Sequence, residues 1–168
     1  MLSKLKNSKG QGFTIIEVMI VLAVAGLILL IVLLAVPALQ RSSRNTQRKN
    51  DISALAGAVA NYISNNNGTV PNNITLSGST AKVDCSGTIS TNCSNTDKNT
   101  ETANVGLFTS ILPTTYSNGL AGPTDTNTVF YVPKATCNST NTGIGSSNSR
   151  SAAFLYMLEP SSNECQEQ

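Results

Sequence analysis

The amino-acid sequence predicts an α+β fold, in which a long N-terminal helix packs against a small antiparallel β-sheet head with long polar loops. Two observations predict it. Residues 18–39 are all apolar except Gly26 and Pro37, which is long enough for a helix that crosses a hydrocarbon core of about 30 Å. The remaining chain holds short β-branched and aromatic runs in a background rich in Ser, Thr and Asn, which make up 58 of 168 residues. That background is typical of a loop-rich extracellular surface.

The N-terminal segment carries a basic leader and one isolated acidic residue. Lys4, Lys6 and Lys9 precede the apolar run, and Glu17 is the only acidic residue before Asp51. A carboxylate at mid-bilayer costs about 2.5–3.5 kcal/mol on insertion scales, so Glu17 is a functional candidate. The run is too long for a cleaved secretory signal. An ordinary signal anchor is the simplest alternative, but it does not explain Glu17.

The residues around Gly12 resemble the start of type IV prepilins, with a type IVa-like short leader, and of the related pseudopilins. The resemblance rests on Gly12 followed by Phe13-Thr14-Ile15-Ile16-Glu17, after the basic leader and before the apolar helix. The resemblance is strong over residues 4–40 and moderate to about residue 71. Beyond that residue it concerns only the overall architecture. It implies a prepilin leader peptide over 1–12, a transmembrane or filament-core helix over 13–39, its amphipathic continuation over 40–67, and a globular β-rich head over 68–168.

The resemblance also implies a maturation and assembly chemistry. A prepilin peptidase would cut between Gly12 and Phe13 and methylate the new amino group of Phe13. Glycine before the cut lets an extended backbone enter a narrow active site. Glu17 would then meet the Phe13 ammonium of a neighbouring subunit, and this pair would set register because an unpaired charge in an apolar core is costly.

The resemblance extends to partners and location. It implies other pilin subunits in a helical homopolymer, the prepilin peptidase, and a pilus assembly platform with its motor ATPases. The chain would cross the membrane once before assembly and lie in a cell-surface pilus afterwards. The basic residues on the two sides of the apolar run do not decide its orientation. We expect the N-terminus inside the cell from the resemblance and from the cysteines.

The rest of the helix is predicted from periodicity and breakers. Gly26 and Pro37 predict a kink or a loosened stretch, since proline removes a backbone donor and clashes with the preceding turn. One apolar stripe follows at helical spacing, formed by Ile52, Leu55, Ala56, Val59, Tyr62 and Ile63. Asn65-Asn66-Asn67-Gly68 predicts the helix end, and Pro71 prevents continuation.

The head contains four predicted strands, at 81–85, 105–112, 128–132 and 151–158. Pro133 and Pro160 are expected to close the last two. The polar stretches 86–104 and 138–150 predict exposed loops, because they contain too few apolar side chains to pack. A sheet packed on the helical stripe completes the α+β head.

Four cysteines, Cys85, Cys93, Cys137 and Cys165, all follow the apolar segment. An even number beyond a membrane segment predicts disulfides in an oxidising compartment. The simplest pairing is Cys85–Cys93 with Cys137–Cys165, although four cysteines allow three pairings. The resemblance agrees, since a bridged C-terminal loop recurs in pilins. A four-cysteine zinc site is the rival, but the spacing does not match a zinc knuckle.

The composition argues against catalysis and against partners chosen by charge. The chain has no histidine, the commonest general base, so we expect no catalytic residues, no metal, no cofactor and no enzyme activity. The net charge of +2 is too small to indicate nucleic acid or an acidic partner. The cluster Arg41, Arg44, Arg48 and Lys49 predicts a solvated or headgroup-facing stretch. Nucleic-acid binding there has no support, because the cluster lacks aromatic residues.

The preferred interpretation is a structural subunit of a type IV pilus, polymerised through its N-terminal helix. A minor pilin or a secretion-type pseudopilin is the alternative within the family. The alternative from another class is a bitopic surface-anchored binding module that does not polymerise. Processing discriminates between the classes, since an anchored module keeps residues 1–12. Adhesion, twitching motility and DNA uptake are not separated by the sequence.

Overall fold

The computed structural model describes residues 12–84, 101–117 and 119–168. Residues 1–11 of the expected leader, Cys85, Cys93 and most of the expected loop at 86–104 therefore lie outside the described residues. The chain divides into two compact units, residues 1–40 and residues 41–168, which are described separately below.

The described part of the first unit is helical from Ile15 onward, as the start of helix α1 (Ile15–Asn65). Its large apolar side chains are exposed, from Phe13 at 88% to Leu39 at 67%. By length and composition α1 is long and apolar enough to cross a membrane, and none of its most apolar stretch is buried. Exposure of so much apolar surface requires another apolar environment to cover it.

In the second unit α1 becomes amphipathic, as its periodicity predicts. The predicted stripe is buried at Ile52, Leu55, Ala56, Val59 and Tyr62, with Ile63 partly buried. The helix ends at Asn65, and the last two residues of the turn that follows have positive φ, 53° at Asn67 and 81° at Gly68. The Gly68 amide donates to the carbonyl of Ile63 at 2.8 Å, which satisfies one of the last helical carbonyls. The predicted stop is confirmed.

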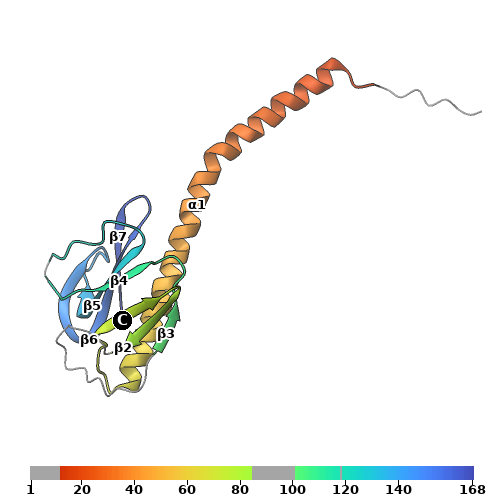
Figure 1. Ribbon diagram of the computed structural model, residues 1–168. Coiled ribbons are helices and arrows are strands. Elements are labelled where there is room, and N and C mark those ends of the chain that lie inside the picture. Colours follow the sequence, from red (N-terminus) through yellow and green to blue (C-terminus); the bar gives the residue numbers. More distant parts are fainter. Residues whose placement is uncertain (1–11, 85–100, 118) are drawn as a thin grey trace, which may run out of the picture. The chain divides into compact units, whose positions relative to one another are not determined.

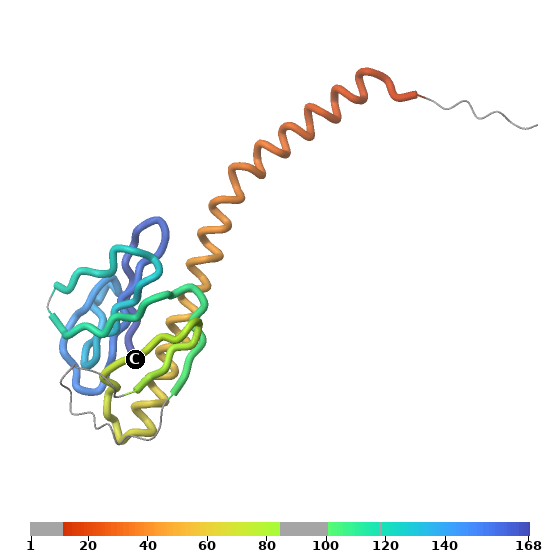
Figure 2. The backbone as a smooth tube through the Cα atoms, in the orientation of Figure 1, coloured from red at the N-terminus to blue at the C-terminus, as the bar shows by residue number. Residues whose placement is uncertain are grey.

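Two sheets complete the second unit (Figure 1). The first has the order β1-β2-β3 and is antiparallel, with β1 at Asn73–Ser77, β2 at Thr80–Asp84 and β3 at Glu101–Asn104. The second has the order β4-β5-β6-β7, with β4 at Ser110–Pro113, β5 at Thr128–Cys137, β6 at Ile144–Leu158 and β7 at Ser162–Glu167. Figure 2 follows the backbone to the C-terminus, which lies among these strands.

The predicted α+β class is confirmed, but the head is not one antiparallel sheet. Strands β4 and β5 are parallel, with Ile111 opposite Val129. Parallel neighbours need a crossover connection rather than a hairpin. Residues 114–127 provide it, and β1 and β4 come into contact where the two sheets meet.

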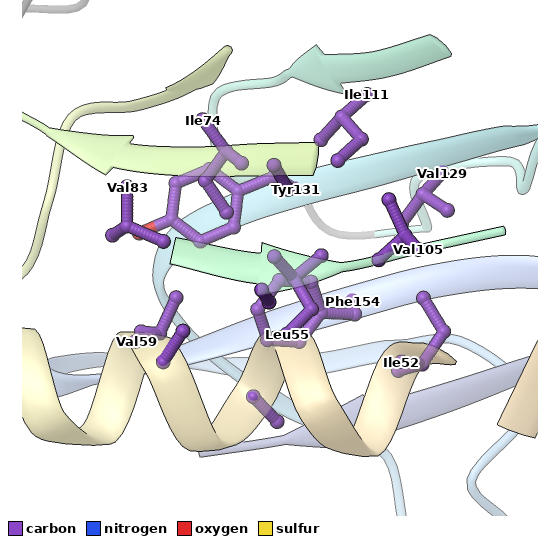
Figure 3. Close-up of a cluster of buried hydrophobic side chains, with 14 of the residues drawn as sticks. Ile52, Leu55, Val59, Ile74, Val83, Val105, Ile111, Val129, Tyr131 and Phe154 are labelled. Atoms are coloured by element: carbon purple, nitrogen blue, oxygen red, sulfur yellow. The ribbon is translucent and has the colours of Figure 1, made fainter. Parts of the chain in front are cut away.

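One hydrophobic core joins α1 to both sheets. In Figure 3 Ile52, Leu55 and Val59 point from α1 toward side chains of the strands. Tyr131 and Phe154 lie at the centre of this core with ring centroids 5.4 Å apart, and the Tyr131 hydroxyl donates to the carbonyl of Pro71 at 2.8 Å. Complete burial of each large aliphatic side chain contributes about 1.5–3 kcal/mol. The helical stripe is therefore the element that holds the two sheets together.

The far face of the second sheet has a smaller apolar cluster. It is formed by Val132, Ala135, Ile144, Ala153, Leu155 and Cys165, with Leu120 from the crossover connection packed against it. Gly122 of the same connection lies so close to Asn163 that an added Cβ would come within 2.4 Å of its amide nitrogen. The crossover connection therefore packs on the sheet, and a side chain at residue 122 would require Asn163 to move.

The predicted strand at 105–112 is wrong for most of its length. Only its last residues belong to β4, and Val105 and Phe108 are buried in the connection from β3. The backbone amides of Gly106 and Leu107 donate to one oxygen of Asp51, at 2.8 and 3.0 Å. Since these amides bond to a carboxylate on α1, they do not join a strand ladder.

The predicted loop at 138–150 is also wrong, because β6 begins at Ile144. A turn at 138–143 connects β5 to β6, and the polar residues that follow are exposed positions on a strand. The polar composition correctly predicted that these residues are exposed, but it wrongly predicted that they form no strand. Strand β5 likewise continues beyond Pro133, through a register shift between Pro133 and Ala135 where Lys134 has a φ of 59°. Proline is tolerated at such a bulge.

Strands β1, β3 and β7 were not predicted. Strands β3 and β7 are short and polar, and β7 contains a single buried residue, Cys165. An edge strand with few apolar side chains carries almost no pattern of period two. Strand β1 does alternate, with Ile74 buried and Leu76 packed against the core, and this short alternation was missed. Strand β6 ends at Leu158, before Pro160, as expected.

Part of the basic cluster is bound to the head, contrary to the prediction of a solvated or headgroup-facing stretch. Glu159 accepts from Arg44 Nε at 2.8 Å and from Arg44 Nη2 at 2.6 Å, and also from Arg48 Nη1 at 3.0 Å. Arg48 is 3% exposed and donates to the carbonyl of Thr126 at 3.0 Å. Lys49 pairs with Glu164 at 2.8 Å. These cations attach α1 to the turn between β6 and β7 and to β7 itself.

The Glu159 cluster predicts a pH-dependent contribution to stability. The hydrogen bond from Arg44, reinforced by Arg48, lowers the pKa of Glu159 from 4.5 to about 2. A depressed pKa means that the stabilisation is complete above pH 4.5 and is lost as the pH falls toward 2. Glu159→Gln should therefore lower the melting temperature at neutral pH, and its difference from wild type should shrink as the pH falls from 4.5 toward 2.

Glu101→Gln is the matched control, since Glu101 accepts from the Asn65 amide but pairs with no arginine. Thermal unfolding of the full-length protein in detergent, followed by circular dichroism across this pH range, makes the comparison. A Glu159→Gln difference that is constant with pH would contradict the predicted linkage.

Candidate processing and assembly site

The helix start is built by a reciprocal pair, Thr14 and Glu17. The Thr14 amide donates to Glu17 Oε2 at 2.9 Å, and the Glu17 amide donates to Thr14 Oγ1 at 3.3 Å. The Thr14 hydroxyl also donates to Glu17 Oε2 at 2.8 Å. This is a capping box, in which threonine at the N-cap and glutamate three residues later satisfy each other's backbone donors.

The capping box explains how α1 can begin directly after Phe13. The first helical amides have no carbonyl partner within a helix, and an acidic side chain near them is also favoured by the helix dipole. The first backbone helical bond runs from the Val18 amide to the carbonyl of Thr14, at 3.4 Å. In a single subunit the Glu17 carboxylate is therefore bound by its own chain.

Gly12 and Phe13 immediately precede this cap, outside any regular element and exposed. A Cβ built at Gly12 would meet nothing within 4 Å. Among the described residues there is thus no steric reason for glycine at this position. Any requirement for glycine here would come from a molecule that binds this segment.

Gly26 and Pro37 both lie inside α1, and the helix is assigned without a break at either residue. A Cβ at Gly26 would also meet nothing within 4 Å. Proline at 37 has no amide to donate to the carbonyl four residues earlier, so one helical hydrogen bond is missing there. The loosening expected at these residues on assembly stays a prediction.

The structure joins Cys137 to Cys165, one of the two bridges that the simplest pairing predicted, with Cα atoms 5.7 Å apart. The bridge connects the end of β5 to β7. The Cys165 amide donates to the carbonyl of Asn141 at 2.8 Å, and the Cys137 amide donates to Glu167 Oε2 at 2.9 Å. Two bridged sulfurs do not supply thiolates, which contradicts a four-cysteine zinc site. The predicted Cys85–Cys93 bridge lies outside the described residues.

Two features of these sites were not predicted from the sequence. Thr14 was missed, although threonine followed three residues later by glutamate and an apolar run is a recognisable capping signature. Glu159 was missed as the partner of Arg44 and Arg48, and no local pattern predicts a contact between residues more than 100 positions apart in the chain.

Comparison with known families identifies the N-terminal segment. Residues 7–33 match the model of the prokaryotic N-terminal methylation motif, the leader signature of type IV pilins and prepilins. No curated protein and no solved structure matches the chain.

The fold and the motif together define a class. The apolar N-terminal helix and the methylation motif fit a membrane-anchored precursor, and the motif points to a structural subunit. The motif supports a prepilin that is similar to the type IV pilins and pseudopilins. It implies, in general terms, processing by a prepilin peptidase and association with other pilin subunits. The Cys137–Cys165 bridge fits that class.

The bridge predicts a measurable contribution to stability. Its sequence separation is 28, for which the chain-entropy model gives about 3–4 kcal/mol. The double variant Cys137→Ser with Cys165→Ser should lose a free energy of unfolding of this size, measured by denaturant titration of the full-length protein. Peptide mapping without reductant should recover Cys137 and Cys165 in one linked pair. Free thiols at both positions in the exported protein would contradict the assignment.

Proposed function

We propose that the chain is the structural subunit of a type IV pilus, cut after Gly12, methylated at Phe13 and polymerised through its N-terminal helix. The observation that supports it best is the position of Glu17. The carboxylate lies in the first turn of an exposed apolar helix, about one turn after the predicted cut and within the matched motif.

In the proposed assembly mechanism, Glu17 exchanges its partner Thr14 for the ammonium group of a neighbouring subunit. In the isolated subunit Thr14 supplies hydrogen bonds to the carboxylate but no positive charge. Cleavage creates an ammonium at Phe13, and a neighbouring subunit would bring its own ammonium to Glu17. In an apolar surrounding a carboxylate left without countercharge is costly, so the pairing would select one axial offset between subunits.

The proposal divides the chain into four parts. Residues 1–12 form the leader, residues 13–39 the transmembrane and later filament-core helix, residues 40–67 its amphipathic continuation and residues 68–168 the head. Gly26 and Pro37 would be points where the helix loosens during assembly. The assembly platform and its motor ATPases would extract the subunit from the membrane, where it spans once, into a filament at the cell surface.

The first test concerns maturation. Gly12→Val should leave full-length precursor in the membrane, because a branched side chain would clash in the narrow active site of the peptidase. The described chain itself offers no clash at residue 12, so folding is expected to be unchanged. Gly10→Val is the matched control and should still be cut. Mass spectrometry of membrane and sheared filament fractions distinguishes the precursor from a chain that begins at methylated Phe13.

The outcomes separate the classes of function. A mature chain that begins at Met1 in filaments would contradict the proposal. A chain that keeps residues 1–12 and stays in the membrane would favour a surface-anchored binding module that does not polymerise. A processed chain found only in trace amounts within filaments would favour a minor pilin or a secretion-type pseudopilin.

The second test removes the charge of Glu17 and keeps its structural role. Glutamine also forms capping boxes, so Glu17→Gln should preserve the helix start and the bond from the Thr14 amide. Membrane insertion and cleavage should persist, while filaments fall to few or none, counted by electron microscopy. Thr14→Ser, which also keeps a capping hydroxyl, is the control and should assemble. Filaments of Glu17→Gln at wild-type number would show that apolar packing of the helices suffices.

A further inference from the structure

Most cations of the second unit are paired with carboxylates of the same chain. The described salt bridges involve Arg44, Arg48, Lys49 and Lys82. Lys134 on β5 and Arg150 on β6 form no salt bridge with any described residue, and neither does Arg41, which lies on α1 at the boundary with the first unit. The charges of Lys134 and Arg150 are therefore available to another molecule.

Lys134 and Arg150 belong to one bulge at a corner of the second sheet. Residues 133 and 135 of β5 pair with residues 152 and 147 of β6, so that residues 148–151 lie opposite Lys134 alone. Arg150 is exposed and Lys134 is partly exposed. A bulge of this kind interrupts the ladder and redirects side chains away from the sheet.

The bulge is held in place by its own hydrogen bonds. Asn148 Oδ1 accepts from the Arg150 amide at 3.1 Å, and the Ser147 hydroxyl donates to the carbonyl of Lys134 at 3.4 Å. Lys134 has a φ of 59°, a left-handed conformation that lysine rarely adopts. Backbone strain of this kind persists only where the surrounding structure enforces it, and such sites are often functional. The two cations are thus presented together before any partner arrives.

Asp125 is the corresponding carboxylate at the start of β5. It is exposed and accepts from the Asn127 amide at 2.8 Å, and it forms no salt bridge with any described residue. The other carboxylates near this end are engaged, since Glu159 and Glu164 pair with cations and Asp51 accepts from two backbone amides. Asp125 therefore offers an exposed negative charge without a countercharge.

The unpaired cations and the unpaired carboxylate lie at opposite ends of the second unit. Near the start of β5, the Thr126 carbonyl accepts from Arg48 Nε on α1 at 3.0 Å. Farther along β5, the Tyr131 hydroxyl donates to the carbonyl of Pro71, which follows the end of α1. Strand β5 therefore runs alongside α1 toward the end of that helix. At about 3.3 Å per residue, residues 128–134 span roughly 20 Å.

We propose that the bulge with Lys134 and Arg150 contacts Asp125 of a second copy of this chain, as a head-to-tail charge contact between subunits. The inference rests on the proposed function, because it requires subunits that assemble in one direction. A filament of identical copies uses heterologous contacts, in which two different surfaces of the chain complement each other. Exposed ion pairs contribute little affinity, so this contact would mainly select the offset between neighbouring heads.

The contact can be captured chemically in filaments of the full-length wild-type protein. A carbodiimide condenses a carboxylate with a lysine amine that touches it, with loss of water. Asp125 and Lys134 are too far apart within one subunit, so an amide bond between them must join two subunits. Denaturing gels should show covalent multimers, and mass spectrometry should recover Asp125 linked to Lys134. Lys134→Arg keeps the charge but removes the amine, so it should assemble normally and give no link at Asp125.

Neutralisation tests whether the contact supports assembly. Asp125→Asn keeps an oxygen for the Asn127 amide and removes the charge, so filaments should fall by about twofold to fivefold, counted by electron microscopy. Adding Lys134→Gln and Arg150→Gln should cause no further loss, because the same contact is already broken. Glu101→Gln is the matched control and should assemble as wild type, since Glu101 accepts from the side-chain amide of Asn65.

The outcomes separate this inference from the proposed function. Wild-type filaments without an Asp125–Lys134 link, a wild-type number of filaments from Asp125→Asn, or a further loss in the combined variant would each overturn the charge contact alone. A wild-type chain that forms no filaments would contradict the proposed function and the contact together.

Discussion

The second unit depends on the packing of one helical stripe against two sheets. Ile52, Leu55 and Val59 are fully buried, and the strands that cover them come from both sheets. Neither sheet has a helix of its own, so removal of this contact would leave two small sheets with exposed apolar faces. The stripe also determines which side of α1 carries the polar attachments.

The polar attachments lie on the flanks of that stripe. Asp51 binds two amides of the connection between β3 and β4, while Arg44 and Arg48 bind Glu159. Exposed ion pairs contribute little individually, but Arg48 is buried and also bonds a carbonyl. Such a cation requires its partners, because it would otherwise be buried without countercharge. The attachments therefore specify the rotation of α1 about its axis relative to the strands of the second unit.

The N-terminal part of α1 differs from the second unit, because no core of its own covers its apolar side chains. Its apolar side chains are exposed, and the only acidic group there is bound by its own helix start. A helix of this composition is stable in an apolar surrounding because its backbone bonds are internal. Under the proposed function the same helix would exchange lipid for neighbouring helices, and Glu17 would exchange Thr14 for an ammonium. The capping box allows this exchange, since it holds the carboxylate without neutralising it.

The sequence by itself determined the features that local pattern encodes. The apolar run, the stripe from Ile52 and the stop after Asn65 follow from periodicity and breakers. The methylation motif is local as well. These features depend on residues that are close in the chain or on a single long helix, so no knowledge of the fold was needed.

Only the tertiary structure decided how distant segments pair. The parallel contact of β4 with β5, the continuation of β5 past Pro133 and the strand character of the polar residues after Ile144 depend on the neighbouring strand, not on the residues themselves. The Arg44–Glu159–Arg48 cluster likewise combines residues from both ends of the second unit. The spacing of polar side chains along the sequence does not predict their partners, because hydrogen bonds and ion pairs depend on position in space rather than on spacing in the chain.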